Sequence, residues 1–551
     1  MNTCRKCATE FKIAPESMAF YERMGVPTPR DCPACRMRQR IMFRNEHKLY
    51  KRTCDGTGKS IVSIYDTGTP FPVYHVDFYW SDRWNALGFG QEFDFSRSFF
   101  AQFAELSTKV PRLALTKRNC ENSEYVNNEE EDKNCYMCFA GAFCEDCYFC
   151  RFTLNSKNCV DCLNTSRSEL CYECVNTLNS YHCRHSQNLK NCSEVFLSED
   201  LIGCTDCIAS IGLINQQYFI LNIKYSETEY LAKKAQLLTN YASELKKYAA
   251  EFRTLKNSVS NRFAHITNSE NVTGDYILNS KDCRECFDIL ECQDCAYIQD
   301  GQNAKDCEDC FITYRNELTY NTMGVCLDAV NCIVGCYCWA CTDTMYSQNC
   351  FSSSHLFGCI GLSNQHYCIL NKPYKKEEYA QLVPKIIEHM KKGEEWGEFF
   401  PAELSPFAYN ETVAQEYFPL TPQEARARGF RWKEEQEIDL SAITKKIPAE
   451  KLPRDVAEIP DDILNWALIC SESKRPYIIQ KEELNFYRKL NLPIPQFHPE
   501  VRYLKRMNLR NPRHLWSRVC ANCGKKVATS FAPERTEQIL CSQCYGQKVF
   551  A

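Results

Sequence analysis

The chain has 551 residues, of which 44% are hydrophobic and 38 are cysteines, and its formal net charge is −4. This length allows a large core in roughly three or four domains, so the cysteines are not required as the disulfide framework of a miniprotein. Residues 1–13 lack the apolar segment of a secretory signal, and no stretch has the length and apolarity of a membrane span. We therefore predict a cytoplasmic protein with no membrane partner, whose cysteines are metal ligands or reduced core residues.

The first predicted module spans residues 1–80 and contains two zinc-ribbon positions. The ligands of the first position are Cys4, Cys7, Cys32 and Cys35. Two Cys-x2-Cys turns supply the four soft ligands that tetrahedral zinc requires. The four places of the second position hold Cys54, Thr57, His75 and Phe78. Because only two of these side chains can bind zinc, we expect the second ribbon to be a degenerate copy without metal.

Residues 81–115 form an aromatic-rich connector, and the body that follows consists of two related halves, 116–265 and 266–400. The segment GLINQQYFILNIKYSETEY at 212–230 recurs 149 residues later as GLSNQHYCILNKPYKKEEY. Upstream, Cys-x2-Cys pairs repeat at an offset of 148, and many of these cysteines follow Asn or Asp. Small residues at short intervals, separated by short apolar runs, predict a parallel β-helix-like solenoid with a coil of about 21–24 residues. A closing helix is predicted after each half, where it would cover an unpaired strand edge.

The cysteine pairs of the body leave three interpretations open. The cysteines can stack as small buried side chains, which we favour. They can bind additional zinc. They can also hold an iron–sulfur cluster, and Cys144, Cys147 and Cys150 come nearest to that pattern, but the cysteine that should follow is missing because position 154 is Leu.

A charged linker is predicted over 401–466, with one short helix that has Thr421 as its N-cap and ends at Gly429. A second zinc-ribbon module follows at 467–551. A shift of 466 residues places Cys4 on Cys470 and Cys54 on Cys520 without a gap. In this copy the first ribbon is degenerate, with Cys470, Ser473, His498 and Val501 in its four places. The second ribbon is intact, with Cys520, Cys523, Cys541 and Cys544 as ligands. Two Zn²⁺ ions are therefore expected at the terminal ribbons.

Together these elements predict a mainly β fold with helices. Its centre is an internally duplicated, parallel β-helix-like, cysteine-rich solenoid, flanked by N- and C-terminal zinc-ribbon modules.

Arginines recur every four residues beside the first ribbon of each module, as they would on one face of a helix. They are Arg36, Arg40 and Arg44 in the first module and Arg502, Arg506 and Arg510 in the second. Both ends of the chain are basic, with 13 Lys or Arg against 6 Asp or Glu in residues 1–60, whereas the centre is acidic. One hypothesis is phosphate contact with RNA or DNA. The other is that the arginines pack their helices against the ribbon or the acidic body.

The sequence contains no phosphate loop, dinucleotide fingerprint or clustered histidines, so we predict that the protein is not an enzyme. The leading hypothesis is a zinc-stabilised binding or scaffold protein that engages nucleic acid, most plausibly RNA or a ribonucleoprotein. One alternative is a protein–protein interaction scaffold without nucleic acid. The other is a multi-metal or iron–sulfur redox protein.

Several segments carry a resemblance to known sequences. They are NCYMC, SELCYEC, NQQYFILNIKYS with its copy NQHYCILNKPYK, CPACRMRQR, and LYKRTCDGTGKSIVSIY. Through them the chain resembles an uncharacterised family of cysteine-rich zinc-ribbon proteins predicted from small-genome uncultivated bacteria. The resemblance extends over nearly the whole chain. It implies a bacterial cytosolic origin and zinc ribbons, and it implies no particular activity.

Overall fold

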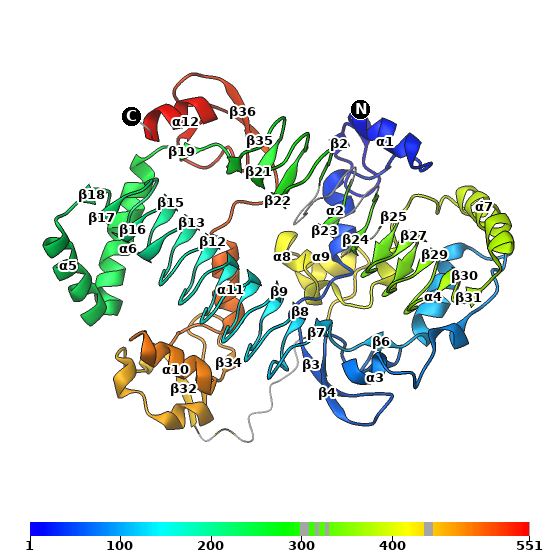
Figure 1. Ribbon diagram of the computed structural model, residues 1–551, viewed down its shortest axis with the longest axis horizontal. Coiled ribbons are helices and arrows are strands. Elements are labelled where there is room, and N and C mark those ends of the chain that lie inside the picture. The colour runs from blue at the N-terminus through cyan, green and yellow to red at the C-terminus, as the bar shows by residue number, and fades with distance from the viewer. Residues whose placement is uncertain (298–307, 314–318, 326–329, 435–442, 444, 550–551) are drawn as a thin grey trace.

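Two stacks of short parallel strands form the body of the computed structural model, with the terminal modules and helices placed around them (Figure 1). The structure describes residues 1–297, 308–313, 319–325, 330–434, 443 and 445–549. The protein is mixed α/β, so the predicted mainly β class is corrected. Many parallel strands and a four-cysteine cluster in each terminal module agree with the prediction.

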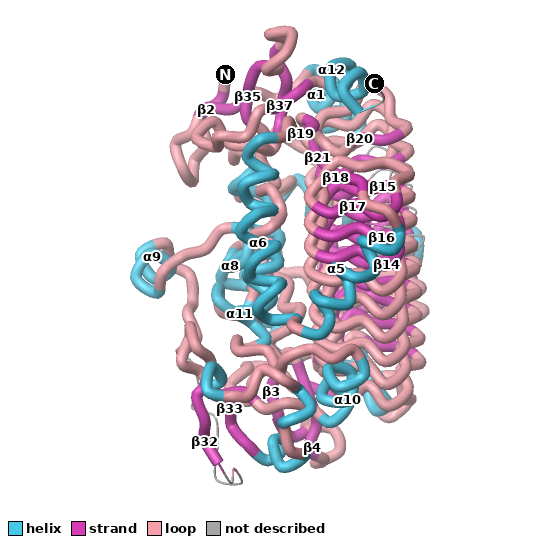
Figure 2. Tube along the Cα trace, turned by 90° about the vertical axis from the view of Figure 1, so that its left-hand side faces the viewer, coloured by secondary structure: helices cyan, strands magenta, loops and turns pink. Residues whose placement is uncertain are grey.

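The first stack contains an eight-stranded parallel sheet and a second sheet of four strands. The larger sheet consists of β7 (Lys117–Arg118), β8 (Asn127–Glu130), β9 (Phe139–Ala142), β10 (Arg151–Leu154), β11 (Leu163–Ser166), β12 (Val175–Leu178), β13 (Gln187–Lys190) and β15 (Glu199–Ile202). The smaller sheet consists of β14 (Ser193–Phe196), β16 (Thr205–Ile208), β17 (Gln217–Ile220) and β18 (Ile223–Lys224). The last strand, β18, is antiparallel to β17 and ends the ladder. Figure 2 shows the successive strands of this stack one above another.

The register of the strands gives the length of one layer. Arg151 pairs with Leu163, and Leu163 pairs with Val175. The chain therefore advances by one layer every 12 residues. Ser156 and Ser168 are also 12 residues apart, and the backbone N–H of Ser168 donates a hydrogen bond to the Ser156 hydroxyl. The longer coil predicted from the cysteine spacing is wrong. The prediction failed because it counted cysteines only. Ser156 and Ser168 occupy the same position in their layers as Cys144 does in its own, so the cysteine spacing is interrupted there.

A left-handed backbone conformation at every third residue bends each layer. Asn155, Asn158 and Asp161 have φ angles of 50°, 50° and 56°. Asn and Asp adopt this conformation more readily than most residues, which explains why so many cysteines follow them. After each bend the next side chain points inward, and Cys159 and Cys162 are at most 1% exposed.

The second stack repeats this arrangement in three sheets. Its strands are β20 (Ile266–Thr267), β21 (Gly274–Leu278), β22 (Cys286–Leu290), β23 (Phe311–Thr313), β24 (Met323–Val325), β25 (Val330–Cys332), β26 (Gly335–Cys336), β27 (Thr342–Met345), β28 (Ser347–Gln348), β29 (Ser354–Phe357), β30 (His366–Ile369) and β31 (Lys372–Pro373). Like β18, β31 is antiparallel to the strand before it. Helices follow both ends: α5 (Glu227–Thr239) and α6 (Tyr241–Ser258) after the first, and α7 (Lys376–Lys392) after the second.

The two terminal modules have the same order of elements. The first comprises β1 (Asn2–Thr3), β2 (Glu10–Phe11), α1 (Pro15–Arg23), α2 (Pro33–Ile41), β3 (Tyr50–Thr53), β4 (Ser60–Ser63), β5 (Val73–Tyr74) and α3 (Val76–Tyr79). The second comprises β33 (Trp466–Ile469), β34 (Pro476–Tyr477), α10 (Lys481–Lys489), α11 (Pro499–Met507), β35 (Trp516–Val519), β36 (Lys526–Thr529), β37 (Ile539–Leu540) and α12 (Ser542–Val549).

The connecting segments are packed into the structure. In the aromatic connector, α4 (Phe99–Lys109) buries Phe99 and Phe103 against the second stack and its closing segment. Residues 401–434 contain α8 (Ala414–Tyr417) and α9 (Pro422–Ala427), and Val413 is 2% exposed. The predicted short helix here is confirmed, with Thr421 as its N-cap. This part of the predicted linker is therefore a packed segment, and β32 (Lys445–Pro448) pairs with β33. Residues 435–442 and 444 of the predicted linker lie outside the described residues.

Short strand pairs attach the second ribbon of each module to the beginning of a stack. In the first module Val73 pairs with Arg112 of β6 (Arg112–Leu113), and in the second Ile539 pairs with Asn261 of β19 (Asn261–Arg262). The two contacts are equivalent, because the offset of 466 relates Val73 to Ile539 and the offset of 149 relates Arg112 to Asn261. The internal duplication therefore extends to the contacts between the parts.

His265 lies where the first stack, the second stack and the last module meet. Its ring lies 3.1 Å from Asp200 and 3.0 Å from Asp275, and it stacks on Tyr276 at a centroid distance of 4.4 Å. Arg262 lies on the far side of Asp200, and Ser530 donates a hydrogen bond to Asp275. Burial lowers the pKa of His265, but Asp275 and Asp200 outweigh it and raise the pKa to about 9.

We expect this junction to weaken in alkaline solution. Because the folded pKa of about 9 exceeds the ordinary value of 6.5, the stabilisation is complete below about pH 6.5 and is lost as the pH rises toward 9. The difference corresponds to about 3 kcal/mol. Melting temperatures measured between pH 6 and 10 should fall more steeply for the native protein than for His265→Gln. Parallel curves for the two proteins would contradict the assignment.

Candidate metal centres and the arginine braces

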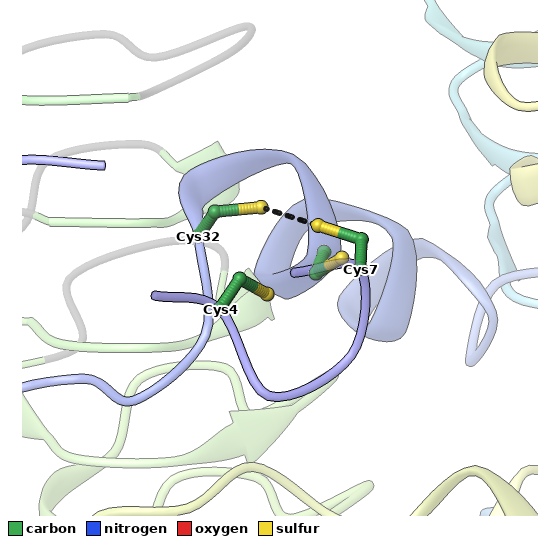
Figure 3. Close-up of side chains that lie close together, drawn as sticks. Cys4, Cys7 and Cys32 are labelled. Atoms are coloured by element: carbon green, nitrogen blue, oxygen red, sulfur yellow. Dashed lines mark hydrogen bonds between the residues drawn. The ribbon is translucent and has the colours of Figure 1, made fainter. Parts of the chain in front are cut away.

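The first four-cysteine group is assembled by a tight turn and the start of a helix. Cys4 and Cys7 lie in the turn between β1 and β2, Cys32 is the N-cap of α2, and Cys35 lies in its first turn. The four sulfur atoms lie within 4.8 Å of one another, and the Sγ atoms of Cys7 and Cys32 are 3.6 Å apart (Figure 3). Ala8 closes the turn with a φ of 58°.

The second group is built in the same way in the last module. Cys520 and Cys523 lie in the turn between β35 and β36, and Cys541 and Cys544 lie at the start of α12. The Sγ atoms of Cys523 and Cys541 are 3.8 Å apart. A hydrogen bond from the backbone N–H of Cys541 lowers the pKa of Cys520 to about 6, which favours the thiolate that binds metal.

Both groups fit a tetrahedral thiolate site. Zn–S bonds of about 2.3 Å place sulfur atoms about 3.8 Å apart, close to the two distances observed. In each group three cysteines are buried and one, Cys7 or Cys523, is exposed. Four protein ligands leave no coordination position for a substrate, so a metal ion here would stabilise the module. The two groups could each hold one metal ion.

The degenerate ribbons keep the turn and lack the ligands. Cys54 repeats the turn, with the N–H of Gly58 donating to its carbonyl oxygen at 2.8 Å, and the ring of Phe78 lies against Gly56. His75 and His498, which replace cysteines, accept hydrogen bonds from backbone N–H groups at the starts of α3 and α11. These side chains are structural, and among the described residues no third ligand joins them.

The body cysteines also have structural partners. Cys159 donates weakly to the carbonyl oxygens of Lys157 and Ser168, at 3.3 and 3.7 Å. Ser168, at the equivalent place in another column, donates to the carbonyl oxygen of Ser166 at 2.9 Å. A serine can therefore replace a cysteine in this position. Within the described parts of the chain, only the two terminal groups bring three or more metal-binding side chains together. Cys307 and Cys326 lie outside these parts.

The first arginine stripe points into the second stack. Arg36 contacts Asp309, and the Arg40 guanidinium lies 3.4 Å from the same carboxylate. Arg36 also donates to the Tyr21 hydroxyl at 3.2 Å. The third arginine of the stripe, Arg44, pairs at 2.6 Å with Glu46. All three arginines are at most 6% exposed.

The second stripe points into the first stack. Arg502 and Arg506 lie 2.6 and 2.9 Å from Asp161, and Arg502 donates to the Tyr487 hydroxyl at 2.9 Å. Burial raises the pKa of Asp161 to about 6, although both arginines oppose this, so the carboxylate is still ionised at neutral pH. Arg510 pairs with Asp288, and its side chain is 9% exposed.

These contacts correct the expectation of a nucleic-acid surface at the six arginines. Their guanidinium groups are buried and face carboxylates of the same chain, so they are not presented to phosphates. We name the two equivalent sets, Arg36 and Arg40 with Asp309, and Arg502 and Arg506 with Asp161, the arginine braces. The offset of 466 relates the arginines and the offset of 148 relates the aspartates. Each module thus packs its arginines against one stack and pairs a strand with the short strand, β6 or β19, that precedes the other stack.

Sequence reasoning missed Asp161 and Asp309. Both precede a cysteine, as Asn and Asp do throughout the body, and this pattern masks them. They could have been identified from the internal duplication, because the offset of 148 that relates the cysteine pairs also places Asp161 on Asp309. Asp rather than Asn at both places is what the arginines require.

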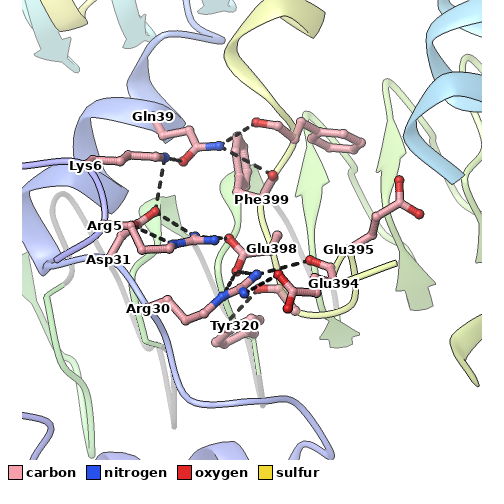
Figure 4. Close-up of polar contacts among 12 residues, drawn as sticks. Arg5, Lys6, Arg30, Asp31, Gln39, Tyr320, Glu394, Glu395, Glu398 and Phe399 are labelled. Carbon is pink, nitrogen blue, oxygen red and sulfur yellow. Dashed lines mark hydrogen bonds and ion pairs between the residues drawn. The ribbon is translucent and has the colours of Figure 1, made fainter. Parts of the chain in front are cut away.

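A further set of ion pairs holds the first metal-binding ribbon to the segment after α7 (Figure 4). Arg5 lies 3.1 Å from Asp31 and 2.8 Å from Glu398, and Arg30 lies 2.7 Å from Glu394. Asp31 is the residue before Cys32. The first four-cysteine group is therefore held in place by contacts on the exposed side of the ribbon as well as by the buried brace.

Comparisons with known proteins give no relative. No family model, no curated protein and no solved structure matches the chain. Over the residues that the structure describes, no helix is both long and apolar enough to cross a bilayer.

Proposed function

We propose that the protein is a zinc-stabilised scaffold that binds a protein partner and does not act through nucleic acid. The observation that carries this proposal is the burial of all six stripe arginines in ion pairs within the chain. The feature that suggested phosphate binding is used to assemble the protein itself. The closed geometry of the metal sites supports a structural role.

The proposal includes the finer description of the body as a duplicated, parallel β-helix-like solenoid in which each turn forms one layer of a stack. The regular parallel register of both stacks supports it. Solenoids present long side faces on which partners bind. The reduced cysteines favour a cytoplasmic location. Membership of the cysteine-rich zinc-ribbon family of small-genome bacteria is also part of the proposal.

The test combines metal analysis with two binding experiments. Elemental analysis should give about two zinc ions per chain and no iron. Fluorescently labelled RNA and DNA, titrated between about 50 and 200 mM salt, should bind no more tightly than the roughly micromolar level of non-specific contacts. Partners captured from cell extract should remain bound after nuclease treatment. Submicromolar affinity for RNA with a steep salt dependence would overturn the proposal in favour of nucleic-acid binding.

A further inference from the structure

A cavity of about 490 Å³ lies where both terminal modules meet the first stack. Residues 47–51 of the first module form one wall, and residues 475–480 and 498–506 of the second module form another. The third wall is the face of the stack between Tyr125 and Arg151. Cavities of this volume accommodate small organic ligands.

Positive charge predominates on the cavity wall. Five basic side chains line it, namely Lys48, Lys51, Arg151, Arg475 and Arg506. Glu500 is the one carboxylate among the lining residues, and Lys48 and Arg475 both contact it. Glu416 and Asp161, behind the wall, pair with Arg151 and Arg506. Arg151 also lies 3.9 Å from Glu46, and among the described residues no carboxylate pairs with the exposed Lys51, so its positive charge remains on the wall.

The two histidines of the wall add no charge at neutral pH. Burial lowers the pKa of His498 to about 4, and burial also lowers the pKa of His47. His47 lies 3.3 Å from Glu416 and 3.9 Å from Glu500, which oppose this effect. The cavity therefore suits a ligand with one anionic group.

Aromatic rings also line the cavity. Tyr136 packs against Tyr125 at a centroid distance of 5.3 Å and against Phe149 at 5.7 Å. Tyr503 also lines the cavity, and the Arg151 guanidinium lies over its ring at 3.6 Å. Such surfaces bind planar rings by stacking, whatever the ring's substituents.

The internal duplication offers a comparison within the chain. A second cavity of about 450 Å³ occupies the equivalent place against the second stack. There Ala34 stands in place of Glu500, and Thr273 and Arg284 stand in place of Tyr125 and Tyr136. The architecture therefore creates both cavities, and aromatic rings line both, but the tyrosine pair Tyr125 and Tyr136 belongs to the first alone.

We propose that the first cavity binds a small aromatic anion of nucleotide size. Tyr125 and Tyr136 would hold the ring, and the basic side chains of the wall would hold the anionic group. This inference is independent of the proposed scaffold function, because it requires neither metal binding nor a protein partner.

Isothermal titration of the full-length, metal-loaded protein tests the proposal with three probes. AMP carries both ring and anion, adenosine carries the ring alone, and ribose 5-phosphate carries the anion alone. AMP is expected to bind at least about tenfold more tightly than either of the others. The absence of saturable binding of AMP at millimolar concentration would overturn the proposal. So would equal affinity for AMP and ribose 5-phosphate.

Two variants locate the binding. Tyr136→Ala should weaken AMP about tenfold, whereas Phe143→Ala, at an exposed ring on the same stack, should not. Lys51→Glu, at the exposed lip, should weaken AMP similarly without disturbing the fold, and Lys59→Glu, at an exposed lysine that does not line the cavity, is its control. Unchanged AMP affinity in both cavity variants would place the ligand elsewhere and overturn the proposal.

Discussion

Replacing Asp309 by Asn is expected to destabilise the protein by about 3–5 kcal/mol. The Asp309 carboxylate is fully buried and faces Arg36 and Arg40, which are 6% and 0% exposed. Without it, two buried guanidinium groups lose the carboxylate with which they form ion pairs. Asp309 has a φ of 65°, and Asn adopts this left-handed conformation as readily as Asp does. The loss of stability therefore measures the removal of the charge and not a change of backbone conformation. Asp161→Asn should destabilise the protein less, because Arg502 keeps a second buried ion pair with Glu483 at 3.3 Å.

Urea denaturation measures these losses. Asp294→Asn, an exposed aspartate with a φ of 54° in the same stack, is the matched control and should change stability by less than about 0.5 kcal/mol. Combining Asp309→Asn with Arg36→Met and Arg40→Met should recover much of the loss, since no unpaired charge is then buried. If Asp309→Asn alone were as stable as the native protein, the brace would have no energetic role.

Replacing Cys520 by Ser is expected to remove one bound metal ion per chain and to unfold the last ribbon. A structural zinc ion stabilises a small module on the order of 10 kcal/mol, because the binding free energy is also folding free energy. Cys54 occupies the equivalent place in the first module, where no third ligand is found within the described residues. Cys54→Ser should therefore keep the full metal content and cost only about 1–2 kcal/mol.

Metal content by elemental analysis and thermal melting of both variants check this prediction. Cys4→Ser and Cys470→Ser form the mirror-image pair, in which the first module carries the intact ribbon. Metal loss is expected for Cys4→Ser and not for Cys470→Ser. Equal metal loss in the two members of either pair would show that the degenerate ribbons also bind metal.

Much of the local structure followed from the sequence. The Cys-x2-Cys spacing predicted both four-cysteine groups, since short-range turns determine which sulfur atoms approach one another. The two internal duplications predicted that the parts would recur, and the contacts of Val73 with Arg112 and of Ile539 with Asn261 follow the same offsets. The short helix after Thr421 was visible in its capping residues.

The length of a turn in the stacks was not predicted correctly. The cysteines alone are unevenly spaced, because serines and threonines share their inward positions. The true period is set by the bend at every third residue, and Asn, Asp, Leu and His all occupy that bend here. Because several residue types adopt the left-handed conformation at the bends, no repeated residue type marks the 12-residue period in a single sequence.

The sequence by itself thus determined the two four-cysteine groups and the duplicated plan of the protein. Only the tertiary structure decided the role of the arginines. Their four-residue spacing is compatible with an exposed basic face or with a buried one, and the choice depends on what lies opposite. Arg36 meets Asp309 across 273 residues of chain, and Arg502 meets Asp161 across 341. Such distant pairing leaves no local trace, because burial of a charge depends on which surfaces the folded chain brings together.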